Sequence, residues 1–85
     1  MMTVEDRYIK LADDTKTVLR AMRIALSNGE GKFESSTDIF YVTCVTGELY
    51  LFKTDQLCGS VRLFQSDDFK LFLMTCLSYL EGEEI

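Results

Sequence analysis

The sequence predicts an α+β fold in which an N-terminal helical region and a C-terminal helix flank an antiparallel sheet. Apolar residues recur every three or four positions near both ends of the chain, and they alternate with a period of two across the middle. Tight turns separate the alternating runs, which leaves no room for the crossovers of about a dozen residues that parallel strands need. We therefore expect a single domain over residues 1–85, with three or four strands in a meander and the C-terminal helix packed on the sheet.

A helical region is expected over residues 4–28. Thr3 is followed by two acidic residues, as is typical of an N-cap and a first helical turn. Asn28-Gly29 then provides a left-handed stop. Between these signals, apolar or small residues recur at spacings of four and three: Val4, Tyr8, Leu11, Thr15, Val18, Met22 and Ala25.

The length of this region leaves two possibilities open. One continuous helix would run about 38 Å, which exceeds the diameter of about 30 Å expected for a compact domain of this size. Such a helix would protrude. The alternative is a break near Asp13-Asp14 that gives two helical segments, because Asp is a poor interior helix residue and a good N-cap.

The β-meander is expected over residues 38–64. Residues 39–46 alternate in the manner of a strand, and a tight turn at Thr46-Gly47 or Gly47-Glu48 leads into a second strand over 49–54. A third, short strand is expected over 61–64, and residues 32–35 are a candidate fourth strand at the edge. If Tyr41 and Tyr50 pack beneath the helices, then some of the other apolar strand residues must line an interface, since they cannot all join them: Phe40, Val42, Leu49, Leu51 and Phe52. Of these, Phe40 and Phe52 are the candidate interface residues.

The C-terminal helix is expected over residues 66–81, capped by Ser66-Asp67-Asp68 and closed by Gly82, with an acidic tail over 82–85. Its expected core face comprises Phe69, Phe72, Leu73, Cys76, Leu77 and Leu80. The opposite side carries Leu71, Met74 and Tyr79, and a helix that is apolar on two sides is buried on two sides. We therefore expect these three residues to anchor a contact with another polypeptide.

The composition argues against most catalytic chemistry. The chain has no histidine, which removes the commonest general base and the commonest zinc ligand. Its three cysteines are too far apart for a CxxC metal or redox motif, and its five glycines form no phosphate-binding loop. We therefore expect no catalytic residue, no metal site and no cofactor. Cys58, in an expected turn, is the one candidate for a reactive thiol.

The charge is distributed unevenly along the chain. Residues 1–28 carry a net charge of +1 and residues 29–85 carry −6, within an overall net charge of −5. Lys16, Arg20 and Arg23 share one face of the expected first helix and are candidates to face a charged partner, or to remain in solvent. Intrahelical pairs of Asp6 with Lys10 and of Asp13 with Lys16 would absorb part of the charge. An acidic chain is a poor candidate for nucleic-acid binding.

These features predict a non-enzymatic protein–protein interaction module in the cytoplasm. No apolar run is long enough to span a membrane, and the N-terminus lacks the pattern of a secretory signal. Ten aromatic residues exceed what one small core hides, which favours a homo-oligomer such as a dimer, or a heteromeric contact. The profile resembles that of many phage-encoded accessory proteins that bind and block a host or phage component.

The expected function is therefore that of a self-associating regulator or inhibitor that blocks a partner protein, either a host protein or another regulatory target. The alternative is a small-ligand or nucleic-acid binder that uses the basic face of the first helix together with Tyr8. An enzymatic alternative would depend on Cys58 alone.

Overall fold

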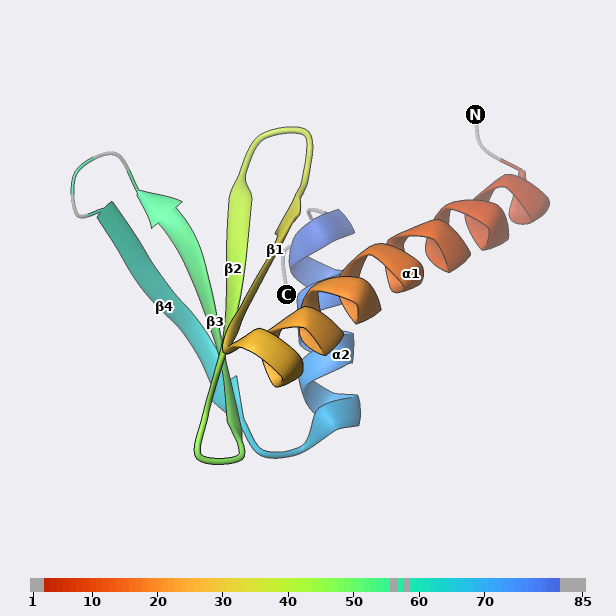
Figure 1. Ribbon diagram of the computed structural model, residues 1–85. Coiled ribbons are helices and arrows are strands. Elements are labelled where there is room, and N and C mark those ends of the chain that lie inside the picture. The colour runs from red at the N-terminus through yellow and green to blue at the C-terminus, as the bar shows by residue number, and fades with distance from the viewer. Residues whose placement is uncertain (1–2, 56, 58, 82–85) are drawn as a thin grey trace.

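A computed structural model describes residues 3–55, 57 and 59–81 and confirms the α+β class (Figure 1). The four strands pair antiparallel in the order β1-β2-β3-β4. The elements follow one another as α1 (Val4–Asn28), β1 (Glu30–Glu34), β2 (Ile39–Val45), β3 (Glu48–Asp55), β4 (Gly59–Ser66) and α2 (Phe69–Glu81). The candidate edge strand at 32–35 is present as β1, and the strand expected over 61–64 is present as β4, which is longer at both ends.

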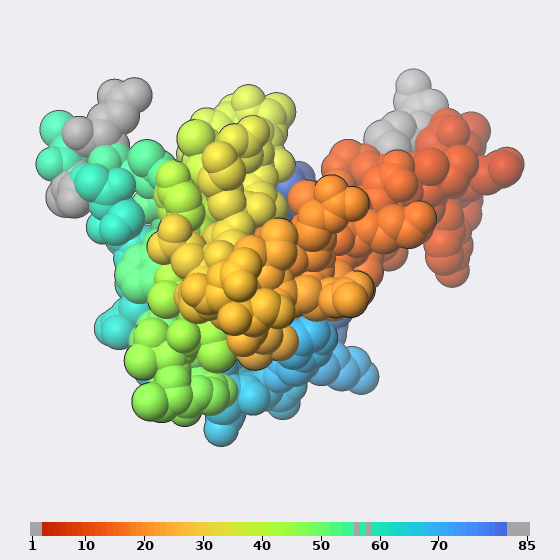
Figure 2. Space-filling model, viewed as in Figure 1, coloured from red at the N-terminus to blue at the C-terminus, as the bar shows by residue number. Residues whose placement is uncertain are grey.

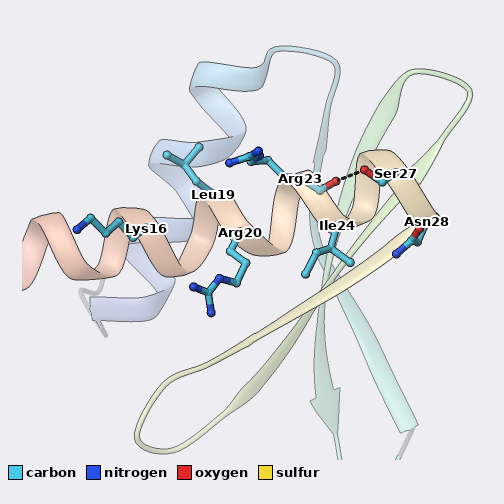
Figure 3. A pocket seen from close by; sticks show the side chains of 7 residues that line it. All are labelled: Lys16, Leu19, Arg20, Arg23, Ile24, Ser27 and Asn28. Atoms are coloured by element: carbon cyan, nitrogen blue, oxygen red, sulfur yellow. Dashed lines mark hydrogen bonds between the residues drawn. The ribbon is translucent and has the colours of Figure 1, made fainter.

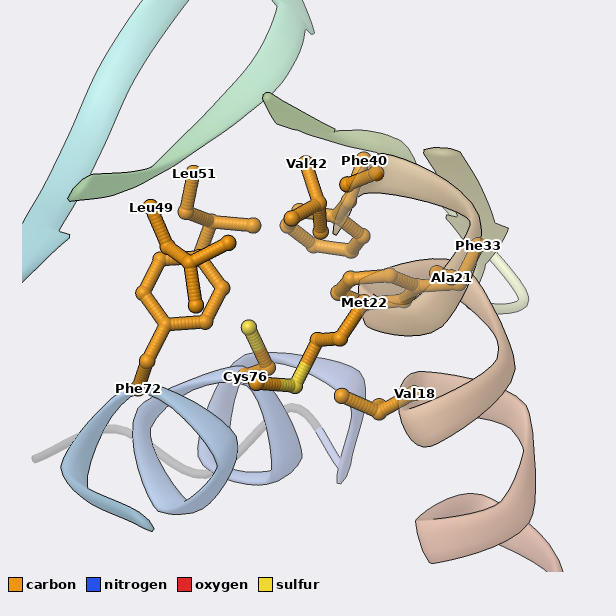
Figure 4. Packing of buried hydrophobic residues seen from close by; sticks show 11 residues of the cluster. Val18, Ala21, Met22, Phe33, Phe40, Val42, Leu49, Leu51, Phe72 and Cys76 are labelled. Atoms are coloured by element: carbon orange, nitrogen blue, oxygen red, sulfur yellow. The ribbon is translucent and has the colours of Figure 1, made fainter. Parts of the chain in front are cut away.

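Both helices cover the same face of the sheet, and the core lies between them and the strands (Figure 4). α1 packs mainly on β1 and β2, while α2 packs on β3 and β4 and against α1. The buried cluster is contributed by all of these elements except β4: Val18, Ala21, Met22, Ala25, Phe33, Phe40, Val42, Leu49, Leu51, Phe72 and Cys76. Of the expected core face of α2, Phe72 and Cys76 are fully buried, whereas Phe69 is exposed.

α1 is one continuous helix and does not break at Asp13-Asp14. Its N-terminus is held by a capping box, in which the Thr3 hydroxyl accepts from the Asp6 N–H and the Asp6 carboxylate accepts from the Thr3 N–H. Asp6 is used in this cap, and the ion pair expected between Asp6 and Lys10 is not formed. Lys10 instead lies 2.9 Å from the Asp14 carboxylate, one turn further along, and this contact helps to keep the acidic pair within the helix.

The continuous helix protrudes from the domain. The longest dimension of the molecule is 41 Å, and the N-terminal half of α1 extends beyond the sheet and α2 (Figures 1 and 2). Every buried residue of α1 lies in its C-terminal half, between Val18 and Ala25. No helix among the described residues is long and apolar enough to cross a membrane.

A close approach at Gly31 joins the C-terminal half of α1 to the sheet. Gly29 ends the helix with a left-handed φ of 93°, and β1 begins at the next residue. A Cβ atom on Gly31 would overlap the carbonyl oxygen of Ala21 and lie 3.1 Å from its Cα. Glycine is therefore required here, because the helix backbone rests directly on the strand.

The expected hairpin between β2 and β3 turns at Thr46-Gly47, which have positive φ values of 49° and 84°. Two successive positive φ values are typical of the tight turns that match strand twist. The register pairs Val45 with Glu48 across this turn. On the other side of β3, the pairing with β4 shifts between Leu51 and Phe52, which places a bulge on the edge strand.

The sheet faces of Phe40, Tyr41 and Tyr50 are the reverse of the arrangement considered from the sequence, whereas Phe52 lies away from the helices as expected. Phe40 is 2% exposed and lies in the core, stacked on Phe33 with ring centroids 5.0 Å apart. Tyr41, Tyr50 and Phe52 lie on the opposite face of the sheet, away from both helices. Phe40 is therefore not an interface residue in this fold, because its alternation partners Val42 and Cys44 share its side of β2.

Candidate functional site

The three basic residues singled out from the sequence line one surface groove on α1 (Figure 3). Lys16, Arg20 and Arg23 are all exposed, and they surround a shallow cavity of about 550 Å³. The rest of the lining is Leu19, Ile24, Ser27 and Asn28, so the groove contains no acidic side chain. The structure therefore brings the predicted charged residues together on one outward surface of the helix.

These cations have no ion-pair partner among the described residues. The ion pairs formed there use other cations, and they join Lys10 to Asp14, Lys32 to Glu34 and Lys53 to Asp38. The pair expected between Asp13 and Lys16 is not among them. The groove thus presents a local excess of positive charge in a protein whose net charge is −5.

A second candidate surface is the apolar stripe on the protruding half of α1, formed by Val4, Tyr8 and Leu11. Their exposed fractions are 74%, 72% and 42%, respectively. Spacings of four and three place the stripe on the same side of the helix as Val18 and Met22, which are fully buried. The stripe therefore continues the core-facing side of α1 past the edge of the domain, and we call it the overhanging stripe.

The predicted anchors on α2 divide between two environments. Leu71 and Met74 are 50% and 57% exposed and lie on the outer side of the helix. Tyr79 is 37% exposed, and its ring lies 6.1 Å from that of Phe40. All three anchors are accessible to a partner, and Tyr79 also covers part of the core.

The open face of the sheet carries a row of residues that sequence reasoning did not assemble. The strand register places Lys32, Tyr41, Phe52 and Arg62 side by side across all four strands. Beside the two central rings lies a hollow of about 290 Å³, which is also lined by Glu30, Thr43 and Ser60. Period-two alternation was enough to assign Tyr41 to one face of its strand. The neighbours of Tyr41 on the other strands depend on the cross-strand register, which the turns determine.

Tyr50 extends this aromatic patch and is tied to its neighbours. Its ring stacks on Phe52 with centroids 6.4 Å apart, and its hydroxyl donates to the Glu48 carboxylate. Gln65 donates to the same carboxylate oxygen. The hydrogen bond to Glu48 raises the pKa of Tyr50, because it stabilises the protonated phenol.

Two of the three cysteines lie among the described residues. Burial raises the pKa of the Cys76 thiol to about 12, which leaves it unreactive at neutral pH. Cys44 is a half-buried free thiol, and Cys58 lies outside the described residues, as do Gly82 and the tail. Within the described part of the chain, no cluster of three or more Cys, Asp or Glu residues could hold a metal ion.

No protein-family model, curated protein or solved structure matches this chain. The inference of function therefore rests on the surfaces described above.

Proposed function

We propose that this protein is a non-enzymatic protein–protein interaction module that regulates or inhibits a partner protein by covering part of its surface. One observation carries the proposal. The overhanging stripe exposes Val4, Tyr8 and Leu11 on the side of α1 that is core-facing elsewhere. Apolar side chains at helical spacing on an unpartnered helix are typical of a helix that docks into the groove of another protein.

The cost of leaving this stripe bare supports the same proposal. Apolar surface exposed to water costs about 25 cal/mol per Å², and large aromatic side chains dominate the energetics of protein interfaces. Tyr8 combines a large apolar ring, which can be buried in an interface, with a hydroxyl that can stay hydrated at the edge of that interface. It is therefore the residue that we expect to contribute most to partner binding.

The outer side of α2 provides a second, smaller contact. Leu71 and Met74 are exposed apolar residues three positions apart. Phe52 lies on the open sheet face, away from both helices, so one flat partner surface cannot cover all of these residues together. We assign the principal contact to the overhanging stripe, and we place the partner, a host protein or another regulatory target, in the cytoplasm.

The test compares two substitutions on one side of α1. Tyr8→Glu places a charge in the overhanging stripe, while Leu26→Glu makes the same change at an exposed apolar residue about five turns further along the same side, where α1 is packed on the sheet. The tagged full-length chain is used to capture partners from a lysate of its natural host, with mass spectrometry of the eluate. We expect Tyr8→Glu to abolish the retention of a near-stoichiometric protein and Leu26→Glu to preserve it.

Both variants are expected to remain folded, because neither residue belongs to the core. Circular dichroism and the midpoint of urea unfolding check this. Equal retention by the two variants, or a clean eluate with the unsubstituted chain, would contradict the proposal.

A second candidate function is anion binding by the basic groove. The observation that favours it is the absence of ion-pair partners for Lys16, Arg20 and Arg23 among the described residues. Tyr8 was expected to assist by stacking on a base. It lies about 12 Å along the helix axis from Lys16, towards the N-terminus, and does not line the groove. An acidic protein also repels a long polyanion.

Salt-dependent binding of a short single-stranded oligonucleotide tests this candidate. Binding at low ionic strength that is abolished by Arg20→Glu would favour it. No binding at low ionic strength would remove it.

A further inference from the structure

The basic groove on α1 has the geometry of a helix-docking surface. Its seven lining residues form two neighbouring rows along the helix, each with a spacing of four. Figure 3 shows Leu19 and Arg23 pointing to one side of the groove and Arg20 and Ile24 to the other. A groove between two such rows is the feature that receives a ridge of side chains from a second helix.

The same outward side of α1 is acidic in the N-terminal half. Counting back from Lys16 in steps of three and four leads to Asp13, Ile9 and Glu5, all of which are exposed. Glu5 and Asp13 form no ion pair with the described residues, like the three cations of the groove. This side therefore runs from negative at its start to positive at its end, and we call it the outward face.

We infer that a second copy of this chain covers the outward face, and that the two α1 helices lie antiparallel in a two-fold symmetric homodimer. An antiparallel arrangement places the acidic half of each copy on the basic half of the other. A parallel arrangement would place the cations of the groove against one another. Charge complementarity thus selects both the occupant and its direction.

The residue numbers fit a single two-fold axis. When the axis passes the helix close to residue 14, Glu5 faces Arg23 of the second copy and Asp13 lies beside Lys16 of the second copy. Ile9 then lies against Leu19 of the second copy, so the exposed isoleucine meets the apolar part of the groove. Both charge contacts and the apolar contact occur twice, as an isologous interface requires.

The exposed area of the chain is large enough for this interface. Its accessible surface of 6183 Å² exceeds the roughly 5,200 Å² expected for a compact monomer of 9.8 kDa. The excess is close to the roughly 800 Å² that each partner buries in a stable dimer of standard size. The protruding half of α1 contributes to this excess (Figure 2).

The dimer leaves most of the overhanging stripe free, because Val4 and Leu11 lie on the far side of the helix and Tyr8 lies about 100° around it from Ile9. Each dimer would present two such stripes, and two linked contacts raise the apparent affinity for a partner that is itself multivalent. The homodimer does not depend on the proposed function, because the two surfaces use different residues.

Charge reversal tests the inference through sedimentation equilibrium of the full-length chain at 25 and 200 mM salt. We expect a mass close to twice 9.8 kDa for the unsubstituted protein. Arg23→Glu and Glu5→Lys should each raise the dissociation constant at least tenfold, and the double variant should recover the affinity. Lys70→Glu, an equal charge reversal on α2, should leave the dissociation constant unchanged and serves as the control.

Three results would overturn the inference. The first is a monomer at 200 μM in low salt. The second is a dimer whose dissociation constant is unchanged by both single charge reversals, because such a dimer uses another surface. The third is a tighter dimer with Arg23→Glu, which indicates parallel helices. Tyr8→Glu should leave the dimer intact, so loss of the dimer and loss of partner capture are separate outcomes.

Discussion

The two halves of α1 carry one sequence pattern but lie in different surroundings. Val18 and Met22 in the C-terminal half are fully buried, whereas Val4 and Tyr8 in the N-terminal half are more than 70% exposed. All four belong to the same side of a helix that is continuous and capped at its start. Helical periodicity thus determines which side is apolar, and the rest of the fold determines how much of that side is covered.

The dimensions of the sheet explain why the coverage stops. α1 has 25 residues, whereas β1 and β2, the strands on which it packs, have five and seven. These lengths correspond to about 38 Å for the helix and about 17 and 24 Å for the strands. The helix is anchored at its C-terminal end, because β1 begins immediately after Gly29 and Gly31 contacts Ala21. With one end fixed on the sheet, the surplus length extends from the other end.

The largest expected effect comes from separating the packed half of α1 from the sheet. Gly31→Ala would place a methyl group against the carbonyl of Ala21, and both partners are backbone atoms that cannot rotate away. We expect a loss of about 3 kcal/mol or more in the free energy of unfolding, or failure to fold. Urea denaturation followed by circular dichroism measures it.

Lys32→Ala, at the next position of β1, is the matched control. Its side chain is exposed, so we expect a change of less than about 0.5 kcal/mol. A Gly31→Ala protein as stable as the control would show that the helix does not rest on this strand.

A sharper comparison uses the same substitution at two positions on one side of α1. Val18→Ala removes two methyl groups from the core and should cost about 2 kcal/mol. Val4→Ala removes them from the overhanging stripe and should change stability by less than about 0.3 kcal/mol, because alanine is also the better helix former. Thermal and urea unfolding at low micromolar concentration measure both values for the monomer.

Comparable losses at the two positions would mean that the overhanging stripe is buried in solution even at low concentration. That outcome would place the stripe in an intramolecular contact and remove the basis of the proposed function.

Local signals in the sequence were sufficient to predict most of the fold. The cap at Thr3 and the stop at Gly29 marked both ends of α1, and Gly47 marked the hairpin. These signals act between neighbouring residues, so they do not depend on tertiary contacts. The break considered at Asp13-Asp14 did not occur, because the Lys10–Asp14 ion pair and the helix on either side outweigh the weak propensity of aspartate.

The candidate surfaces were less accessible from the sequence. Helical spacing was enough to group Lys16, Arg20 and Arg23, because residues three and four apart are neighbours on any helix. The face occupied by Phe40 could not be decided, since alternation defines two sides of a strand but not which one the helices cover. The row from Lys32 to Arg62 depends on the register of three strand pairs, and one of these pairs contains a bulge.

The smallest expected effect comes from removing the helix caps one at a time. Asp68 accepts a hydrogen bond from the Leu71 N–H at the start of α2, and α2 supplies Phe72 and Cys76 to the core. Asp68→Ala should therefore cost about 1 kcal/mol in the free energy of unfolding. Thr3→Ala removes the equivalent bond from α1, but the turns that fray are not packed on the core.

We expect Thr3→Ala to reduce the helical circular dichroism slightly while leaving the unfolding midpoint of the monomer in place, because local fraying is uncoupled from global unfolding. Asp68→Asn and Thr3→Ser, which keep the accepting oxygen, are the matched controls. If Thr3→Ala lowered the midpoint as much as Asp68→Ala, the protruding half of α1 would have to unfold together with the core. If that loss appeared only at concentrations where the chain dimerises, the coupling would instead come from the second copy on the outward face.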